Sequence, residues 1–109
     1  MEIVKQGNVS VVRLPDRLMG KAVREMLTAV REEHEGGATH IAIDFGSTSF
    51  VDSSGIGSLV SLTKDFKTKG TVLSLRALSD DMKELFAETG LDMIFNIETD
   101  AGLDAAKID

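Results

Sequence analysis

Two adjacent serines are the residues of this chain best placed to do chemistry. Ser53 and Ser54 follow Asp52 and precede Gly55, with a second glycine at Gly57. A serine at the start of a helix can cap that helix, act as a nucleophile or accept a phosphate. A glycine inside a helix costs about 1 kcal/mol relative to alanine. The two glycines therefore indicate that backbone or a partner must approach closely at this point.

Nucleophilic catalysis is weakly supported by the residues around these serines. A nucleophile elbow needs glycine two residues before the serine, and here those residues are Val51 for Ser53 and Asp52 for Ser54. A phosphate-binding P-loop needs a Gly-Lys-Ser/Thr sequence, and here Ser58 follows Gly57 directly, with no lysine between them. We therefore expect no catalytic residues and no nucleotide enzyme.

The sequence also offers few residues that could form a metal site or a disulfide bond. The chain has no cysteine and only two histidines, His34 and His40, without paired ligand spacing. Thiolate ligands, thiol nucleophiles and disulfides are therefore excluded. We expect no metal and no cofactor, and we interpret both histidines as structural or solvated.

Composition indicates one small cytoplasmic domain. The 109 residues suit a single domain spanning 1–109. The net charge is −6, which opposes binding to phosphate backbones, so we expect no nucleic-acid partner. No apolar run approaches the ~20 residues that span a bilayer, and the N-terminus lacks the pattern of a signal peptide. We therefore predict no membrane insertion and a cytoplasmic location.

Hydrophobic periodicity and turn residues predict the elements that must position the serines. The pattern favours a mixed α/β sheet carrying helices, in the order ββαβαβαβα. A hairpin joins strands at 3–5 and 9–14 through Gly7 and Asn8, which tolerate positive φ. The predicted helices cover about 20–35, about 54–69, a segment from a cap at Ser79 to Gly90, and an acidic segment from Thr99. The other predicted strands are 41–45, 71–75 and 93–97, with a loop at 46–52.

Two interpretations of the serine pair remain open from the residues alone. Ser53 or Ser54 can be an ordinary N-cap, with the glycines making room for packing. Alternatively, another protein can phosphorylate the serine, because a helix N-terminus accommodates a phosphate well. Phosphorylation adds ~1.5 to 2 negative charges, which would spoil an apolar docking surface around it.

The segment Phe-Val-Asp-Ser-Ser-Gly-Ile-Gly at residues 50–57 resembles the signature loop of STAS domains. This family is named for sulfate transporters and anti-sigma factor antagonists. The resemblance extends to residues 40–45 before the loop and to residues 85–91 and 94–97 near the end. It implies the STAS fold and, more narrowly, a stand-alone bacterial antagonist.

In such antagonists a serine kinase that is also an anti-sigma factor phosphorylates the serine after the loop aspartate. Carried over, Ser53 is the phosphoacceptor, the unphosphorylated form binds the kinase, and phosphorylation releases it until a serine phosphatase resets the switch. The protein itself is then not an enzyme. The resemblance also implies a partner-binding surface at Asp52, Ser54, Gly55, Ile56 and Gly57.

One segment departs from the family pattern. Antagonists usually carry a glycine and, three residues later, an aspartate after the second strand. Here Asp16 replaces the glycine and Met19 replaces the aspartate. We therefore expect Met19 to contribute to an altered partner surface. The alternative is a constitutive scaffold, such as a subunit of a stressosome-like or transporter complex, in which Ser53 is mainly a cap.

Overall fold

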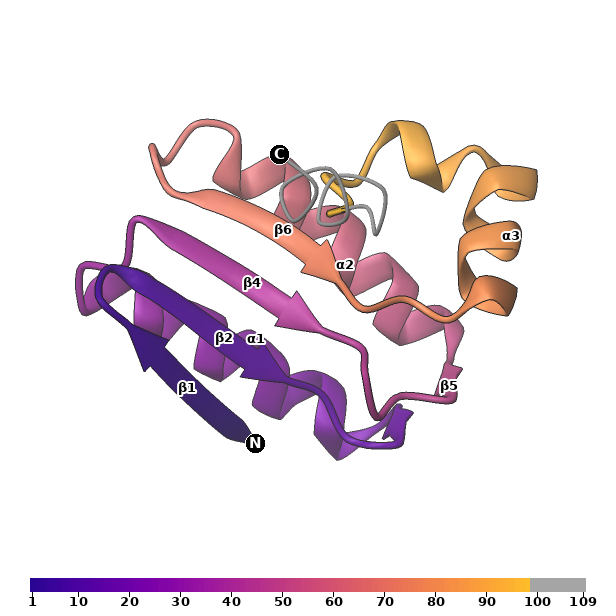
Figure 1. Ribbon diagram of the computed structural model, residues 1–109, viewed down its shortest axis with the longest axis horizontal. Coiled ribbons are helices and arrows are strands. Elements are labelled where there is room, and N and C mark those ends of the chain that lie inside the picture. The colour runs from indigo at the N-terminus through magenta and orange to yellow at the C-terminus, as the bar shows by residue number, and fades with distance from the viewer. Residues whose placement is uncertain (99–109) are drawn as a thin grey trace, which may run out of the picture.

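The computed structural model describes residues 1–98, which form a mixed α/β fold (Figure 1). The predicted fold class is confirmed. The elements, in chain order, are β1 (Glu2–Gln6), β2 (Val9–Arg13), β3 (Arg17–Leu18), α1 (Lys21–Glu35), β4 (His40–Asp44), β5 (Phe50–Val51), α2 (Ser53–Phe66), β6 (Val72–Arg76), α3 (Asp80–Thr89) and the 3₁₀ helix η1 (Leu91–Met93). None of the helices within residues 1–98 is long and apolar enough to cross a membrane.

A four-stranded sheet forms the centre of the fold, in the order β1-β2-β4-β6. β1 and β2 form the predicted antiparallel hairpin, and Gly7 in its turn has φ +62°. β2, β4 and β6 are parallel, with Arg13 beside Asp44 and Asp44 beside Arg76. All three parallel strands therefore end at the same edge of the sheet, from which the chain enters the loops that lead to the helices.

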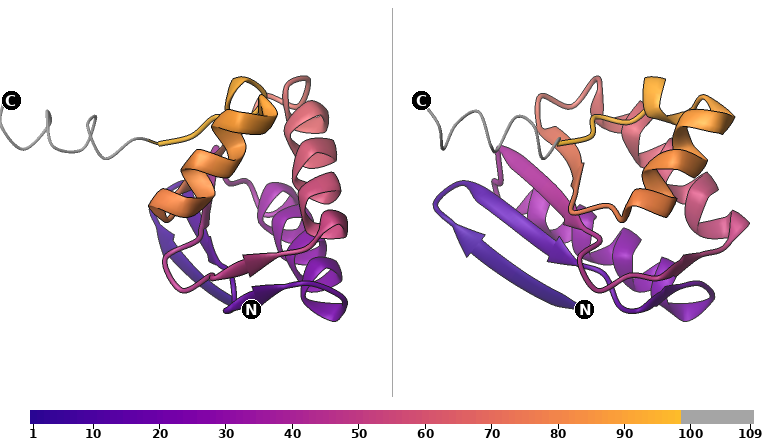
Figure 2. Two further views of the ribbon diagram at one scale, coloured as in Figure 1. Left: turned by 90° about the vertical axis from the view of Figure 1, so that its right-hand side faces the viewer. Right: turned by 45° about the vertical axis from the view of Figure 1, so that its right-hand side comes forward.

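Helices α1 and α2 cover one face of this sheet (Figures 1 and 2). α1 buries Val23, Met26, Ala29 and Val30, which share one helical face. They pack against sheet residues of alternating register, such as Val12, Ile43 and Leu75. α2 adds Leu59, Leu62 and Phe66 to the same core. This packing fixes where α2 begins.

A second, two-stranded sheet connects the segment after β2 to the segment before α2. β3 pairs in parallel with β5, placing Arg17 beside Phe50 and Leu18 beside Val51. The prediction of a loop throughout 46–52 was therefore wrong for β5. Two residues carry too little periodicity to reveal a strand. Its pairing depends on a segment more than thirty residues earlier in the chain.

The C-terminal part differs from the prediction in one element. α3 is capped by Ser79 as expected, with the hydroxyl accepting from the Met82 N–H at 3.2 Å, and Gly90 ends it at φ 76°. Residues 93–97 do not form the predicted strand, because η1 occupies Leu91–Met93 and only a single bridge joins Ile97 to Leu75. The acidic helix expected from Thr99 lies outside the described residues.

Candidate functional site

Asp52 caps helix α2. Its carboxylate accepts hydrogen bonds from the Gly55 N–H at 2.8 Å and from the Ser54 hydroxyl at 2.7 Å. The backbone before the helix is extended, with φ −83° and ψ 177°, as an N-cap requires. Two hydrogen bonds hold the pKa of Asp52 below its ordinary value. The bond from the Ser54 side chain has the larger effect, and the bond from the Gly55 backbone has the next largest. The helix start is therefore held by a charged group.

Ser53 is the first residue of α2 and is exposed. Within residues 1–98 its hydroxyl makes no hydrogen bond, whereas the neighbouring Ser54 hydroxyl donates to Asp52. The interpretation of either serine as the N-cap was therefore wrong, because Asp52 takes that role. Serine and aspartate cap helices about equally well, so the sequence could not decide between them. As a result, the Ser53 hydroxyl points into solvent without a structural task in this part of the chain.

The two glycines of α2 have different surroundings. A Cβ at Gly55 would lie 2.8 Å from Val51 Cγ1 and 3.1 Å from the Leu18 carbonyl oxygen. Gly55 is therefore required for the close approach of α2 to β3 and β5. A Cβ at Gly57 would meet nothing within 4 Å. The expected close approach of backbone is thus present at Gly55 and absent from Gly57 in the described fold.

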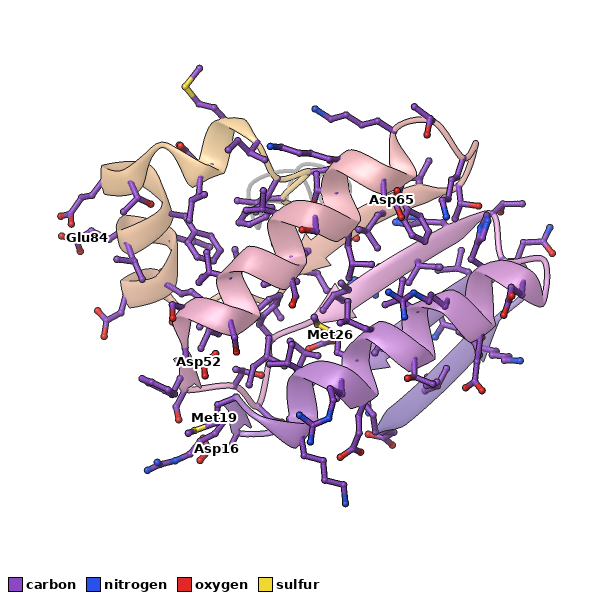
Figure 3. All side chains as sticks on the ribbon, turned by 180° about the vertical axis from the view of Figure 1, so that it is seen from behind. Asp16, Met19, Met26, Asp52, Asp65 and Glu84 are labelled. Carbon is purple, nitrogen blue, oxygen red and sulfur yellow. The ribbon has the colours of Figure 1, made fainter. Side chains whose placement is uncertain are left out.

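Polar contacts attach the segment around Asp16, which is labelled in Figure 3, to the loop before α2. The Asp16 carbonyl accepts from the backbone N–H groups of Ser49 at 2.8 Å and Phe50 at 3.2 Å, and the Ser49 hydroxyl donates to the Asp16 carboxylate. The Asp52 N–H donates to the Leu18 carbonyl at 3.2 Å. Asp16 thus has a structural role that sequence reasoning did not assign to it.

These contacts bring Met19 beside the start of α2. Met19 follows Leu18 of β3 and lies near Asp52 in Figure 3. Its side chain is 42% exposed, and that of Phe50 in β5 is 46% exposed. Sequence reasoning missed Phe50 as a surface residue. An exposed phenylalanine within a loop of small polar residues was the available signal. We call the exposed residues Met19, Phe50, Ser53, Ser54 and Gly57 the loop surface.

Two predicted partner-binding residues face inward instead. Gly55 is buried against β3 and β5, and Ile56 is half-buried and packs against the core. They support the loop surface and contribute less area to it than Met19, Ser54 and Gly57, which are exposed. Asp52 is half-buried, with its carboxylate engaged in the cap.

A second cluster of chemically capable side chains lies on the opposite face of the main sheet. The Ser74 hydroxyl donates to Glu98 at 2.5 Å and lies 2.7 Å from His40 Nε2. Because its only proton goes to Glu98, Ser74 accepts from His40. Arg76 also pairs with Glu98, at 3.2 Å. This arrangement does not present a histidine base to a serine nucleophile, and it makes both residues structural in the described fold.

Comparison with known proteins places this geometry in a family. The family model of the STAS domain matches residues 1–104. The chain belongs to the STAS domain family. Members of this family are generally regulators without enzymatic activity.

Solved structures of STAS proteins share the fold. The Bacillus cell fate determinant SpoIIAA in its phosphorylated form is 22% identical, with a TM-score of 0.69, covering 99% of this chain and 98% of that one. An anti-sigma factor antagonist from Mycobacterium paratuberculosis is 20% identical, with a TM-score of 0.72, covering 97% and 92%. A sulfate transporter family protein from Wolinella succinogenes is 19% identical, with a TM-score of 0.67, covering 96% and 89%.

Proposed function

We propose that this STAS domain is a phosphorylation-controlled protein-binding switch of the bacterial cytoplasm. Its unphosphorylated form binds a cognate serine kinase that acts as an anti-sigma factor or an analogous regulator. Phosphorylation of Ser53 releases that partner, and a serine phosphatase restores binding. The observation that carries the proposal is the Ser53 hydroxyl, which is exposed and free of hydrogen bonds within residues 1–98.

A phosphate on Ser53 is compatible with the folded domain. The first N–H groups of a helix and the positive end of its dipole favour an anion at this position. Because Asp52 already caps α2, modification of Ser53 removes no hydrogen bond from the described structure. The expected product is therefore a folded protein with an altered surface charge.

The same phosphate would strongly change binding at the loop surface. Met19 and Phe50 offer exposed apolar side chains, and Gly57 leaves space for close approach of a partner. A phosphate would add ~1.5 to 2 negative charges beside the carboxylate of Asp52. A partner that buries this surface would have to remove both charges from water, and taking an unpaired charge out of water costs several kcal/mol. Release of the partner follows from that cost.

The anti-sigma factor antagonists among the structural neighbours support a regulatory role, and one of them, SpoIIAA, was solved in a phosphorylated form. The sulfate transporter family protein keeps the alternative open, in which this domain is a constitutive subunit of a transporter or of a stressosome-like assembly. Met19, in place of the usual aspartate, indicates an altered partner surface; it leaves the switch standing and weakens only its connection to a sigma factor.

The decisive experiment combines site mapping with matched variants. Protein isolated from its own cells is examined by intact mass and fragment mapping for phosphate on Ser53. Wild type, Ser53→Ala and Ser53→Asp are then used as bait, and the captured protein is supplied with ATP. We expect a kinase that binds wild type and Ser53→Ala, phosphorylates wild type alone, and binds Ser53→Asp at least about tenfold more weakly.

Ser61→Asp is the control for added charge, because Ser61 is exposed on the same helix two turns further on. It is expected to bind much as wild type does. If native Ser53 carries no phosphate and all three variants capture the same partner equally, the switch is excluded and the constitutive subunit is favoured.

A further inference from the structure

Ser53 and Ser54 are alike in position but differ in the state of their hydroxyl groups. Both are exposed, and they are consecutive residues in the first turn of α2. Exposure alone therefore gives a modifying enzyme no reason to prefer one of them. The Ser54 hydroxyl donates to Asp52 at 2.7 Å, whereas the Ser53 hydroxyl makes no hydrogen bond within residues 1–98. The two serines thus differ in whether the hydroxyl proton is free.

The contact between Asp52 and Ser54 is tied to the cap of α2. One carboxylate oxygen of Asp52, Oδ1, accepts from the Ser54 hydroxyl at 2.7 Å and also from the Gly55 N–H at 2.8 Å. The carboxylate therefore cannot turn away from Ser54 without giving up the cap. Gly55 is itself fixed by close packing, since a Cβ there would lie 3.1 Å from the Leu18 carbonyl oxygen. The bond to Ser54 is also the largest of the effects that lower the pKa of Asp52.

Phosphoryl transfer requires the proton that Asp52 holds at Ser54. When a kinase transfers phosphate from ATP, the serine oxygen forms a bond to the γ-phosphorus, the bond from that phosphorus to the oxygen of the leaving ADP breaks, and the hydroxyl proton passes to a base of the kinase. That base has to reach hydrogen-bond distance from the hydroxyl. At Ser54 it would first have to displace Asp52, whose negative charge also lies beside the attacking oxygen. At Ser53 the proton is available.

We propose that Asp52 is a positioning residue that selects Ser53 over Ser54 as the phosphoacceptor by holding the Ser54 hydroxyl. This inference rests on the proposed function, and it adds to that function the means by which one of two adjacent, exposed serines is chosen. A hydrogen bond to a charged group changes an equilibrium by a factor of roughly ten to a hundred. The selection is expected to be of that order.

Two other causes of selection make different predictions for loss of the carboxylate. Successive side chains of a helix are turned by about 100°, so the direction from which the kinase approaches could select Ser53 alone. In that case phosphate stays on Ser53 when Asp52 is replaced. A carboxylate bonded to a hydroxyl can also act as a base for it. In that case Asp52 assists Ser54, and replacing Asp52 lowers any phosphate found there.

Site mapping in Asp52→Gly separates these causes. Glycine is a tolerated N-cap residue and offers no side-chain acceptor to Ser54. Each protein is incubated with ATP and the kinase captured by wild type, and phosphate is assigned to Ser53 or Ser54 by fragment mapping. Because both serines belong to one molecule, the ratio between them does not depend on how tightly the variant binds the kinase. We expect phosphate on Ser53 in wild type, and a share on Ser54 that rises roughly tenfold or more in Asp52→Gly.

A matched pair of variants gives the same answer without a ratio. Ser53→Ala should stay unmodified, whereas Ser53→Ala combined with Asp52→Gly should accept phosphate on Ser54. Asp65→Asn is the control for lost charge, because Asp65 is exposed on the same helix, and it should leave the ratio unchanged. If circular dichroism shows that Asp52→Gly does not fold, Asp52→Asn replaces it, since its amide oxygen keeps the cap as a neutral and weaker acceptor. A ratio that stays unchanged, or phosphate on Ser54 that falls, in a folded variant would overturn the proposal.

Exchange of the hydroxyl protons with water, followed by NMR at low temperature, tests the same contact without a kinase. We expect slow exchange at Ser54 in wild type, fast exchange there in Asp52→Gly, and fast exchange at Ser53 in both. Equally fast exchange at the two serines of wild type would refute the selection by Asp52 while leaving a phosphate on Ser53, and hence the switch, in place. Slow exchange at Ser54 with no phosphate on any of the proteins would instead overturn the proposed function on which the inference rests.

Discussion

Alanine substitutions at the two glycines of α2 should change stability in opposite directions. Gly55 and Gly57 are two residues apart in one helix, so both substitutions gain helix propensity, worth about 0.5 to 1 kcal/mol. At Gly57 a Cβ meets nothing within 4 Å, and the full gain remains. We expect Gly57→Ala to raise the free energy of unfolding by about 0.5 to 1 kcal/mol, and the melting temperature by roughly 3 to 6 °C.

At Gly55 the new Cβ would lie 2.8 Å from Val51 Cγ1, 3.1 Å from the Leu18 carbonyl oxygen and 3.2 Å from Leu18 Cδ2. Val51 can move, but the carbonyl belongs to backbone that holds the loop through its bond from the Asp52 N–H. Inserting a methyl group into such packing costs about 1 to 3 kcal/mol. After subtraction of the helix gain, Gly55→Ala should destabilise the domain by about 1 kcal/mol, and by at most about 2.5 kcal/mol.

Urea unfolding followed by far-UV circular dichroism measures both values, with the slope of the transition as the check for two-state behaviour. Loss of stability in Gly57→Ala, or no loss in Gly55→Ala, would contradict the packing described around α2. The more stable Gly57→Ala also bears on the proposed switch, because its methyl group would project from the loop surface. It should capture the partner more weakly while being better folded, and unchanged capture would remove Gly57 from that surface.

Three further predictions concern contacts of single side chains. The pKa of Asp52 is depressed in the folded protein, so its carboxylate stabilises the fold above its ordinary pKa of about 3.9, and that contribution is lost as the pH falls through the folded value. The stability advantage of wild type over Asp52→Asn in urea titrations should therefore shrink below about pH 4, and an advantage that grows with acid would contradict this sign. Asp16→Ala removes the bond from Ser49 and should cost about 0.5 to 1.5 kcal/mol, with faster hydrogen exchange at the Asp52 amide; unchanged exchange would show that the backbone bonds suffice. Ser79→Ala should cost about 1 kcal/mol through loss of the α3 cap, whereas Ser79→Asp should be nearly neutral in the same melts.

The helices could be predicted closely because their signals are local. The apolar stripe of α1 and the Ser79 and Gly90 boundaries of α3 each lie within a few turns of chain. β5 could not be predicted, because its two residues form a strand only through pairing with β3. The start of α3 was predicted correctly, whereas the 3₁₀ helix η1 was not. A cap is encoded locally, whereas a short extended segment at 93–97 depends on what lies beside it.

The position of the candidate residues along the chain could be predicted more closely than the contacts that each of them makes. The sequence predicted a loop that ends at Asp52 and a helix that begins at about Ser54, and in the structure Asp52 is the N-cap and Ser53 the first residue of α2. Which of them caps the helix depends on where β5 ends. That position is set by backbone hydrogen bonds that the carbonyls of Asp16 and Leu18 accept from the loop and from Asp52. The exposure of Phe50 likewise follows from the orientation of β5, to which its own sequence neighbourhood gives no clue.

The rigid presentation of residue 53 has a consequence for any enzyme that modifies it. Ser53 is held between a paired strand and a capped helix, with Val51 bonded into β5 and Asp52 bonded to Gly55. Its backbone therefore cannot be drawn out as an extended peptide without breaking that cap and that pairing. An enzyme acting on the native domain has to recognise a three-dimensional epitope, so short peptides of the same sequence would be poor substrates. Modification would then also report that the domain has folded.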